Sequence, residues 1–439
     1  MFHPHAKCVL TILFLLGSSG LFAQTRGTSD PLSERENNPY SKYGIGELQN
    51  GNSTVLRGMG NATSAFENPY ELNTDNPSSY SFLKRTTFEA GMTASTRSVA
   101  AQGSSYTTGT ATLSYLTIGI PVNNNAGLCF GFKPYSHAFY ALVDTIFSPN
   151  SPIGQTVRSY RGDGGLNYAY IGGAYRYKEL SIGFNAGYMF GTLTSNTGVT
   201  SIDTVVTNRA YTADFANYNR IGGIYWKGGL MWEHKLDSSL TLRLGGTFTL
   251  GQSLTERLNA YQVSVFNFGD TLVNDTSANS GESTGKLKLP MSYSIGVMLV
   301  KNNKWGLALD YTATQWSQFN STPDVGRNYA IAKGSYKVSL GGELTPDAGN
   351  IRNYFARVTY RTGFYYGTDY LTFQNTQLPI YGVTLGASLP IRRSLSHLHT
   401  SLDVGRLGTT TNNLIQQTYV RFSLGMSFND LWFIKRKYD

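Results

Sequence analysis

Charged residues are scarce in this chain of 439 residues. Asp, Glu, Lys and Arg together make up 14% of it, whereas an average soluble domain contains roughly 25%. The shortage does not indicate disorder, because 13% of the residues are aromatic and disordered chains contain few of these. The formal net charge is +9, but the only basic run is Lys435-Arg436-Lys437. A nucleic-acid partner is therefore not expected.

Cysteines and long apolar runs are also rare. The two cysteines are Cys8 and Cys129. Residues 1–23 have the pattern of a secretory signal peptide, with an apolar run over 9–16 and a small-residue cleavage site at 21–23. The run is too short to cross a bilayer as a helix. Cleavage would leave Cys129 as the only thiol, so no internal disulfide is expected.

What the chain has in abundance is alternation of apolar and polar residues. Successive side chains of a β-strand point to opposite faces, so alternation predicts strands with one apolar and one polar face. The pattern is clearest in the last predicted strand and recurs back to residue 86. It predicts about 14 strands, over residues 86–101, 107–122, 128–144, 166–178, 180–196, 218–236, 240–262, 286–301, 305–319, 335–344, 354–371, 378–391, 396–407 and 415–428.

The connections between these strands favour a membrane barrel. Tight turns such as 178–179 and 302–303 alternate with loops such as 146–165 and 264–285, which is typical of outer-membrane barrels. A soluble sandwich would alternate as well. The signal peptide, the scarcity of charge and strands longer than the roughly 9–11 residues that cross a membrane favour the barrel. We therefore predict an all-β fold, a transmembrane antiparallel β-barrel over residues 85–428, in the outer membrane of a Gram-negative bacterium.

The parity of the charged residues agrees with this fold. Along each predicted strand the charged residues alternate with the apolar ones, so they lie on the opposite face of the wall. They are therefore predicted to face the lumen and to line a channel or to hold a plug by ion pairs. Arg406 is an exception near a strand end. Trp226, Trp232, Trp305 and Trp316 are interpreted as parts of the aromatic girdles at the membrane interfaces, with ligand stacking as the alternative for any that face inward.

The remaining segments precede and follow the predicted strands in the sequence. Residues 24–37 are polar and are predicted to be flexible. Residues 38–84 contain prolines and glycines without a sustained period, and a piece of this length is expected to pack inside something larger. A ring of about 14 strands has a lumen that needs water or a plug. We predict that residues 38–84 are that plug, and that residues 429–439 form a periplasmic tail.

Two stretches resemble a known family. Arg57-Gly58-Met59-Gly60-Asn61-Ala62, followed by Asn76-Pro77-Ser78, is similar to the N-terminal hatch of FadL/TodX-type outer-membrane transport proteins. The closing residues Phe428 to Lys437 resemble the end of a FadL-like branch that also includes secretion-system accessory barrels. The resemblance implies a barrel of 14 strands with the N-terminus folded into the lumen, and the candidate hatch residues are Arg57, Gly58, Met59, Gly60, Asn76 and Pro77.

The resemblance also implies a function, the uptake of hydrophobic small molecules that resemble long-chain fatty acids. In this interpretation a ligand meets the hatch at residues such as Met59, Ala62 and Phe66 and leaves sideways through a gap in the wall. Pro134 lies within the third predicted strand, and proline cannot donate to the β-ladder. It is the candidate for a wall gap, the alternative being that the strand simply leaves the membrane there.

A different function stays open. The barrel would then transport nothing and would serve as a subunit or docking platform of an outer-membrane machine for secretion or assembly. The Trp-Phe-Ile triplet at 432–434 mildly favours this alternative, because it needs burial or a partner. The expected partners are membrane lipid, a hydrophobic small molecule and outer-membrane proteins.

Enzymatic and metal sites find little support. The chain contains no Gly-x-Ser-x-Gly elbow, and Gly281 to Lys286 lacks the Ser or Thr that a phosphate-binding loop requires after its lysine. A triad assembled across the barrel stays an alternative. His397 and His399 share a predicted face with Asp403, but the polarity of a lumen explains them as well as a metal does. We predict neither an enzyme nor a cofactor or metal.

Overall fold

The structure is a computed structural model, and it describes residues 37–49, 51–101, 104–146, 156–201, 211–266, 271–275, 282–302 and 304–430. The predicted signal peptide, nearly all of the predicted flexible segment and residues 431–439 of the predicted tail lie outside these ranges. In the part of the chain that is described, no helix is long and apolar enough to cross a membrane.

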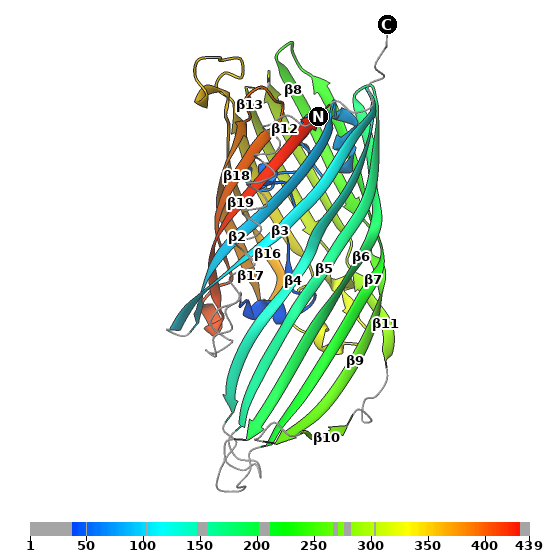
Figure 1. Cartoon of the computed structure of the whole chain (residues 1–439), viewed down its shortest axis with the longest axis vertical. Helices are drawn as coiled ribbons and strands as arrows, with labels where there is room; N and C mark the ends of the chain where they lie inside the picture. Colours follow the sequence, from blue (N-terminus) through cyan, green and yellow to red (C-terminus); the bar gives the residue numbers. More distant parts are fainter. Residues whose placement is uncertain are drawn as a thin grey trace, which may run out of the picture. The chain divides into compact units, whose positions relative to one another are not determined.

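The described residues form a closed antiparallel β-barrel whose wall has 14 strands (Figure 1). Two of them are interrupted and carry two labels each, β8 with β9 and β11 with β12. The wall comprises β2 (Thr86–Ala101), β3 (Ser104–Asn123), β4 (Ala126–Ile146), β5 (Thr156–Tyr177), β6 (Leu180–Ser201), β7 (Tyr211–Lys235), β8 (Leu240–Thr249), β9 (Gln252–Phe266), β11 (Ser283–Leu289), β12 (Ser292–Lys301), β13 (Trp305–Thr314), β15 (Ser335–Leu344), β16 (Thr359–Phe373), β17 (Thr376–Pro390), β18 (His397–Leu407) and β19 (Gln416–Asp430).

Shorter elements lie within the barrel and at its ends. The segment before the wall holds η1 (Pro39–Lys42), β1 (Glu47–Leu48), α2 (Thr54–Arg57) and η2 (Pro77–Phe82). The connections hold β10 (Thr271–Asp275), η3 (Trp316–Gln318), β14 (Asn320–Ser321), η4 (Val325–Asn328), η5 (Phe355–Arg357) and η6 (Thr411–Asn413).

All the predicted strands are present, but some bounds were wrong. β5 begins at Thr156 and β7 at Tyr211, ten and seven residues before the predicted starts, so part of the loop expected over 146–165 is strand. Pro290 separates β11 from β12, because proline cannot donate to the ladder. β7 pairs with β8 through residues 228–235 and with β9 through residues 211–222, so one wall strand bends between its two halves. The wall closes between β19 and β2, from Gln416 opposite Ala100 to Asp430 opposite Thr86. β19 thus ends two residues later than predicted, at Asp430.

The outer face of the wall is apolar, as the alternation predicts. Ile224 on β7 and Ile295 on β12 are 71% and 63% exposed, whereas Tyr419 on β19 points inward and is 1% exposed. A soluble sandwich would bury the large apolar side chains and expose the charged ones. The observed arrangement is that of a barrel in hydrocarbon, where every backbone group of the wall must pair.

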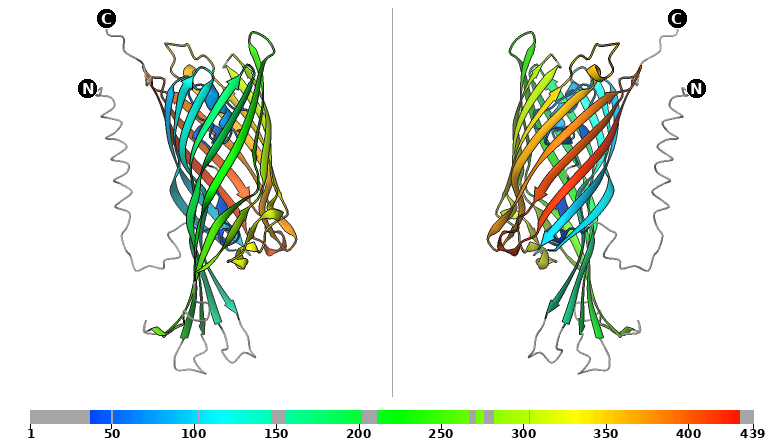
Figure 2. Two further views of the ribbon diagram at one scale, coloured as in Figure 1. Left: turned by 90° about the vertical axis from the view of Figure 1, so that its right-hand side faces the viewer. Right: turned by 90° about the vertical axis from the view of Figure 1, so that its left-hand side faces the viewer.

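The two ends of the barrel differ. At one end, called the turn end here, short turns join β3 to β4, β5 to β6 and β12 to β13. At the other end, called the loop end, β4 to β7 and β9 extend beyond the rest of the wall (Figure 2). β7 alone has 25 residues. Short turns face the periplasm and long loops face outward in barrels of this kind.

Candidate functional site: the hatch and the gap in the wall

Residues 37–84, called the hatch, lie inside the barrel. Asn37 and Asn38 bond to β4 in its loop-end half, through the carbonyl oxygens of Ala141 and Phe139. η2 packs against β4 to β7 in the halves of these strands that lie toward the turn end. The hatch therefore runs along the lumen from the loop end to the turn end, where β2 begins. The prediction of an N-terminal plug in the lumen is confirmed.

The sequence shapes the hatch through two Asn-Pro pairs. The side chain of Asn38 accepts a hydrogen bond from the backbone N–H of Tyr40, and that of Asn76 accepts one from Ser78. In each case the asparagine caps a short helix whose first residue is proline, which needs no donor partner there. Asn76 also donates to the carbonyl oxygens of Ser64 and of Leu230 on β7, at 2.5 and 3.1 Å. The cap therefore also fixes the hatch to the wall.

Glycines in the wall bring the hatch into contact with the backbone of the strands. At Gly386 on β17, a Cβ atom would lie 2.9 Å from the Cα of Gly58, and at Gly425 on β19 it would lie 2.5 Å from Oγ1 of Thr54. Eleven strands carry a glycine at which a Cβ atom would approach a hatch atom to under 3.0 Å, namely Gly119, Gly127, Gly172, Gly183, Gly229, Gly245, Gly296, Gly341, Gly363, Gly386 and Gly425. The hatch thus packs around most of the circumference without an intervening layer of side chains.

Ion pairs hold the hatch as well. Its carboxylates pair with cations of the wall. Glu47 contacts Arg97 and Arg421, Glu67 contacts Arg243, Glu71 contacts Arg361, and Asp75 contacts Lys133 and Lys227. These cations come from strands all around the barrel. Of the two roles predicted for the inward charges, the structure shows the pinning of the plug.

Glu47 has two cationic partners and a hydrogen-bond donor. Its oxygens lie 2.5 Å from a guanidinium nitrogen of Arg97 and 2.7 Å from one of Arg421, and it accepts a hydrogen bond from Asn38. Burial, the largest single influence, raises the pKa of Glu47, but the two guanidinium charges and the hydrogen bonds outweigh it and lower that pKa from 4.5 to about 2. The carboxylate is therefore charged at any physiological pH.

The wall is split on its loop-end side between β3 and β4. Their pairing runs from Asn123 opposite Ala126 to Leu116 opposite Phe132 and stops there, two residues before Pro134. Both strands are irregular at this point. The register of β4 shifts between Pro134 and Ser136, and β3 carries a bulge at Ser114 in its pairing with β2. Figure 1 shows β3 and β4 separating toward the loop end.

The hatch takes the place of β3 along the free edge of β4. β1 pairs with it, Glu47 opposite His137 and Leu48 opposite Ser136. The backbone N–H groups of Asn38 and Gln49 donate to Phe139 and Tyr135. The ladder of β4 is thus completed by the plug rather than by the neighbouring wall strand.

The loop between β13 and β15, residues 315–334, folds back over the lumen and is called the lid here. Arg327 donates to the carbonyl oxygen of Gly44 in the hatch, and the ring of Trp316 stacks on Tyr370 of β16 at 4.3 Å. Trp316 is 2% exposed, so the prediction that it belongs to an interfacial girdle is wrong for this residue. The alternation rule does not apply to it, because it lies in η3 and not in a strand.

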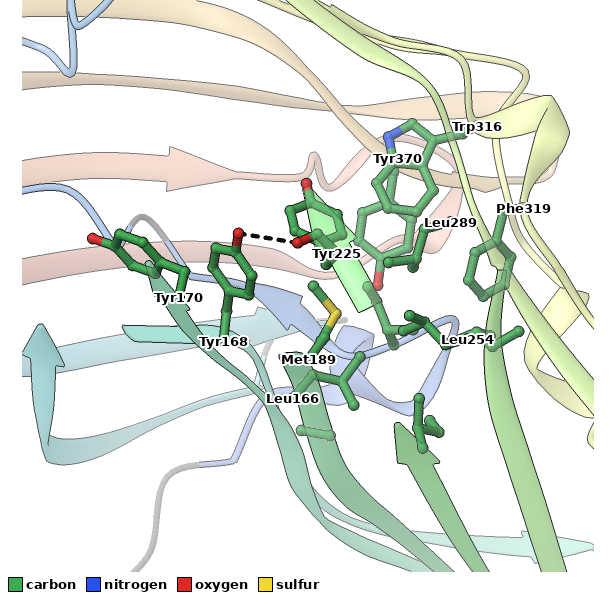
Figure 3. Close-up of a cluster of buried hydrophobic side chains, with 14 of the residues drawn as sticks. Leu166, Tyr168, Tyr170, Met189, Tyr225, Leu254, Leu289, Trp316, Phe319 and Tyr370 are labelled. Atoms are coloured by element: carbon green, nitrogen blue, oxygen red, sulfur yellow. Dashed lines mark hydrogen bonds between the residues drawn. The ribbon is translucent and has the colours of Figure 1, made fainter. Parts of the chain in front are cut away.

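An apolar cluster lines the inner wall below the lid (Figure 3). Leu166, Met189 and Leu254 are fully buried there, and the hydroxyl of Tyr168 donates to the carbonyl oxygen of Tyr225 at 3.2 Å. The loop-end half of the lumen is therefore occupied by packed side chains of the wall, the lid and the hatch.

The structure places the predicted site residues at two levels of the hatch. The side chain of Arg57 donates to the carbonyl oxygen of Asn52 and to hydroxyls on β2 and β19. Gly58 and Gly60 contact the backbone of the wall, whereas Asn76 and Pro77 begin η2. Met59, Ala62 and Phe66 are at most 1% exposed and pack with Val55, Leu56, Ala65, Met298, Val300 and Ala308.

Sequence reasoning missed the wall glycines and the lid. The glycines occupy inward-facing positions, where the alternation predicts polar side chains. Glycine in place of a polar residue at these positions is the sequence feature that could have indicated close contact with the hatch. His399 needs no metal to explain it, since both of its ring nitrogens lie within 3.0 Å of the hydroxyls of Ser388 and Ser427. Within the described ranges, no three residues among His, Cys, Asp and Glu are arranged to hold a metal ion.

Comparison with known sequences decides the family. A sequence profile of the BamG family matches residues 6–439. This chain belongs to the BamG family. Compared with curated protein sequences, it shows no significant match.

Solved structures share the fold of this BamG-family barrel. It is similar to a Pseudomonas aeruginosa FadL homologue (TM-score 0.57, 13% identity, 88% of this chain and 99% of that chain). It is also similar to the Pseudomonas putida toluene transporter TodX (TM-score 0.53, 16% identity, 88% of this chain and 99% of that chain). A third similar structure is the CymD monoaromatic hydrocarbon channel (TM-score 0.53, 14% identity, 89% of this chain and 99% of that chain). The predicted FadL-like barrel and its place in the Gram-negative outer membrane are thus confirmed.

Proposed function

We propose that this BamG-family barrel is a sealed, FadL-like subunit of an outer-membrane protein machine and serves there as a docking platform. The observation that carries the proposal is the contact between the hatch and the backbone of eleven wall strands. Such contact leaves the hatch no room to tilt, and the lid covers it at the loop end. Membership of the BamG family favours partners among the outer-membrane machinery.

The turn end offers a place for a periplasmic partner. A cavity of about 620 Å³ opens there beside hatch residues 67–71. Its acidic residues Glu67, Glu71 and Glu343 are paired with Arg243 and Arg361. The cations Lys304, Arg357 and Arg393 also line it, so the mouth of the cavity has an excess of positive charge. An acidic segment of a partner protein is the chemistry that fits.

The proposal is tested by isolating the protein from its own membrane in mild detergent and identifying what accompanies it by mass spectrometry. A protein partner at a fixed ratio, with no bound hydrophobic small molecule, is the expected result. Planar-bilayer recording of the same preparation should show no conductance above that of protein-free bilayers. A preparation without a partner that conducts, or that carries stoichiometric fatty acid, would contradict the proposal.

The gap between β3 and β4 favours a second candidate, the uptake of hydrophobic molecules such as long-chain fatty acids. A ligand could leave there sideways if η1 and β1 withdrew from the edge of β4. Met59, Ala62 and Phe66 are the residues proposed to meet such a ligand, and Pro134 marks the exit. Their present burial requires the hatch to rearrange first.

A disulfide across the gap separates the two candidates. Leu48 and Ser136 face each other in the pairing of β1 with β4, and facing strand residues lie within the Cα range of a disulfide. The variant Leu48→Cys with Ser136→Cys, once oxidised, should retain its partner and its role in cells if the barrel is a platform. Loss of fatty-acid uptake on oxidation, with recovery on reduction, would establish transport instead. Each single-cysteine variant controls for the substitutions themselves.

A further inference from the structure

Four exposed basic side chains gather on the outer face of β7, β9 and β11. Arg220 and Arg257 lie directly opposite each other, and Lys286 and Lys288 follow on the next strand, opposite Thr255 and Ser253. Their outward direction follows from their neighbours, since Asn219, Glu256 and Leu287 point inward and are fully buried. We call these four residues the basic patch.

The basic patch lies directly above the apolar belt of the barrel. On β7, Arg220 has the same parity as Ile224, which is 71% exposed, and follows it toward the loop end. On the neighbouring wall strand, Leu250 is 52% exposed and precedes Arg257 in the same direction. Basic residues at this depth cost about 0–1 kcal/mol rather than the 2–4 kcal/mol of the midplane. The patch therefore lies at the level of the headgroups of the outer leaflet.

The charges of the basic patch are poorly compensated. Like charges directly opposite on paired strands destabilise a sheet, and Arg220 and Arg257 are such a pair. Glu282 contacts Arg257 at 3.3 Å, and both side chains are about half exposed. Within the described residues, Arg220, Lys286 and Lys288 have no side-chain ion pair. An anion between the four side chains would relieve this repulsion.

We propose that the basic patch binds the phosphate groups of the glycolipid that forms the outer leaflet. Arginine forks match phosphate oxygens in pairs, and lysines add point charges. The acyl chains of the same molecule would lie on the apolar belt beside Phe190, Ile224 and Leu250, which are all exposed. A soluble anion would use only the charges, whereas this lipid uses both surfaces. The site is independent of whether the barrel transports or docks.

The test is titration of the purified full-length mature protein with diphosphorylated lipid A, followed by native mass spectrometry. The variant Arg220→Gln, Arg257→Gln, Lys286→Gln and Lys288→Gln should bind at least about tenfold more weakly than wild type. A charge-matched control replaces four exposed basic residues of the turn end, Lys178, Lys235, Lys301 and Arg352, with Gln and should bind like wild type. The single variant Glu282→Gln should bind more tightly, because it removes the anion that contacts the patch among the residues the structure describes.

Two further measurements decide the source of the phosphate. Lipid A stripped of its phosphates should bind wild type as weakly as the patch variant binds the intact lipid. Inorganic phosphate at the same concentration should not displace lipid A. Equal affinity of wild type and patch variant for lipid A would overturn the proposal, as would displacement by inorganic phosphate or an acidic protein bound at the patch in its place. Heat modifiability on gels verifies that each variant is folded.

Discussion

At the scale of single residues, the wall glycines determine how tightly the lumen is closed. A glycine facing the hatch admits backbone where any other residue would insert a Cβ atom. Gly245 and Gly246 are neighbours on β8 that face opposite sides of the wall. A Cβ at Gly245 would collide with the carbonyl of Ser64, whereas one at Gly246 would lie 3.4 Å from its nearest neighbour, the carbonyl oxygen of Ser294. The pair therefore isolates contact with the hatch from any other effect of adding a methyl group.

We predict that Gly245→Ala loosens the hatch and that Gly246→Ala does not. Overpacking of this kind costs about 1–3 kcal/mol, which would raise the population of a displaced hatch roughly 5- to 150-fold. The measurement is the uptake of a large antibiotic by cells that carry each variant. Equal sensitivity of the two strains, at equal amounts of folded barrel, would show that the backbone contact does not close the lumen.

Acid should release the hatch only under extreme conditions. The pKa of Glu47 is lower in the docked hatch, at about 2, than its ordinary value of 4.5. The contribution of Glu47 to docking is then fully present above about pH 4.5 and is lost as the pH falls through about 2. Bilayer conductance should stay at its baseline from pH 7 to pH 5 and rise only below about pH 4. In Glu47→Gln this acid-dependent step should be smaller, and an unchanged step would assign it to another group.

At the scale of elements, the wall was predictable from the sequence and the inside of the barrel was not. Alternation is a local property, and it located all 14 wall strands, although β5 and β7 begin ten and seven residues before their predicted starts at 166 and 218. The break at Pro290 and the loss of pairing before Pro134 were also indicated locally, because proline has no backbone N–H to donate to the β-ladder. The course of the hatch depends on contacts between residues hundreds of positions apart, such as Gly60 with Thr384. No local pattern records such contacts.

The candidate site was predictable to the same extent. The resemblance located the hatch at Arg57 to Gly60 and at Asn76-Pro77, where the structure has tight contacts with the wall. The same reasoning assigned Met59 and Phe66 to a ligand, and in the structure both belong to a buried apolar cluster that also contains Met298 of the wall. An apolar side chain in a hatch looks alike in sequence whether it meets a ligand or a strand.

We predict that the packing of Trp316 holds the lid closed. Trp316→Ala removes the ring that stacks on Tyr370 and the indole N–H that donates to Ser335 at 2.9 Å. Truncation of a buried Trp typically costs about 3–5 kcal/mol, so the lid should open while the wall remains intact. Limited proteolysis should then cleave between residues 315 and 334. Tyr329→Ala in the same loop removes a side chain that is 70% exposed and should leave cleavage at the wild-type level. Equal cleavage of both variants would contradict the packing of the lid.

At the scale of the whole molecule, the inferences about a partner, a lateral gap and a lipid site depend on which end faces outward. The turn end carries the cavity proposed for a periplasmic partner, and the loop end carries the gap and the basic patch. Short turns on one side and long loops on the other indicate the direction. The direction can be measured by labelling introduced cysteines, because Cys129 is fully buried and is not expected to react.

Single cysteines should report that direction. Asn196 on β6 is exposed in the part of the wall that projects at the loop end, and Asp237 is exposed in the turn between β7 and β8. We predict that Asn196→Cys reacts with a membrane-impermeant maleimide on intact cells, whereas Asp237→Cys reacts only after the outer membrane is permeabilised. The parent protein should remain unlabelled in both cases. The reverse pattern would place the basic patch in the periplasmic leaflet and the cavity outside, and the lipid and the partner proposed for these two sites would both be wrong.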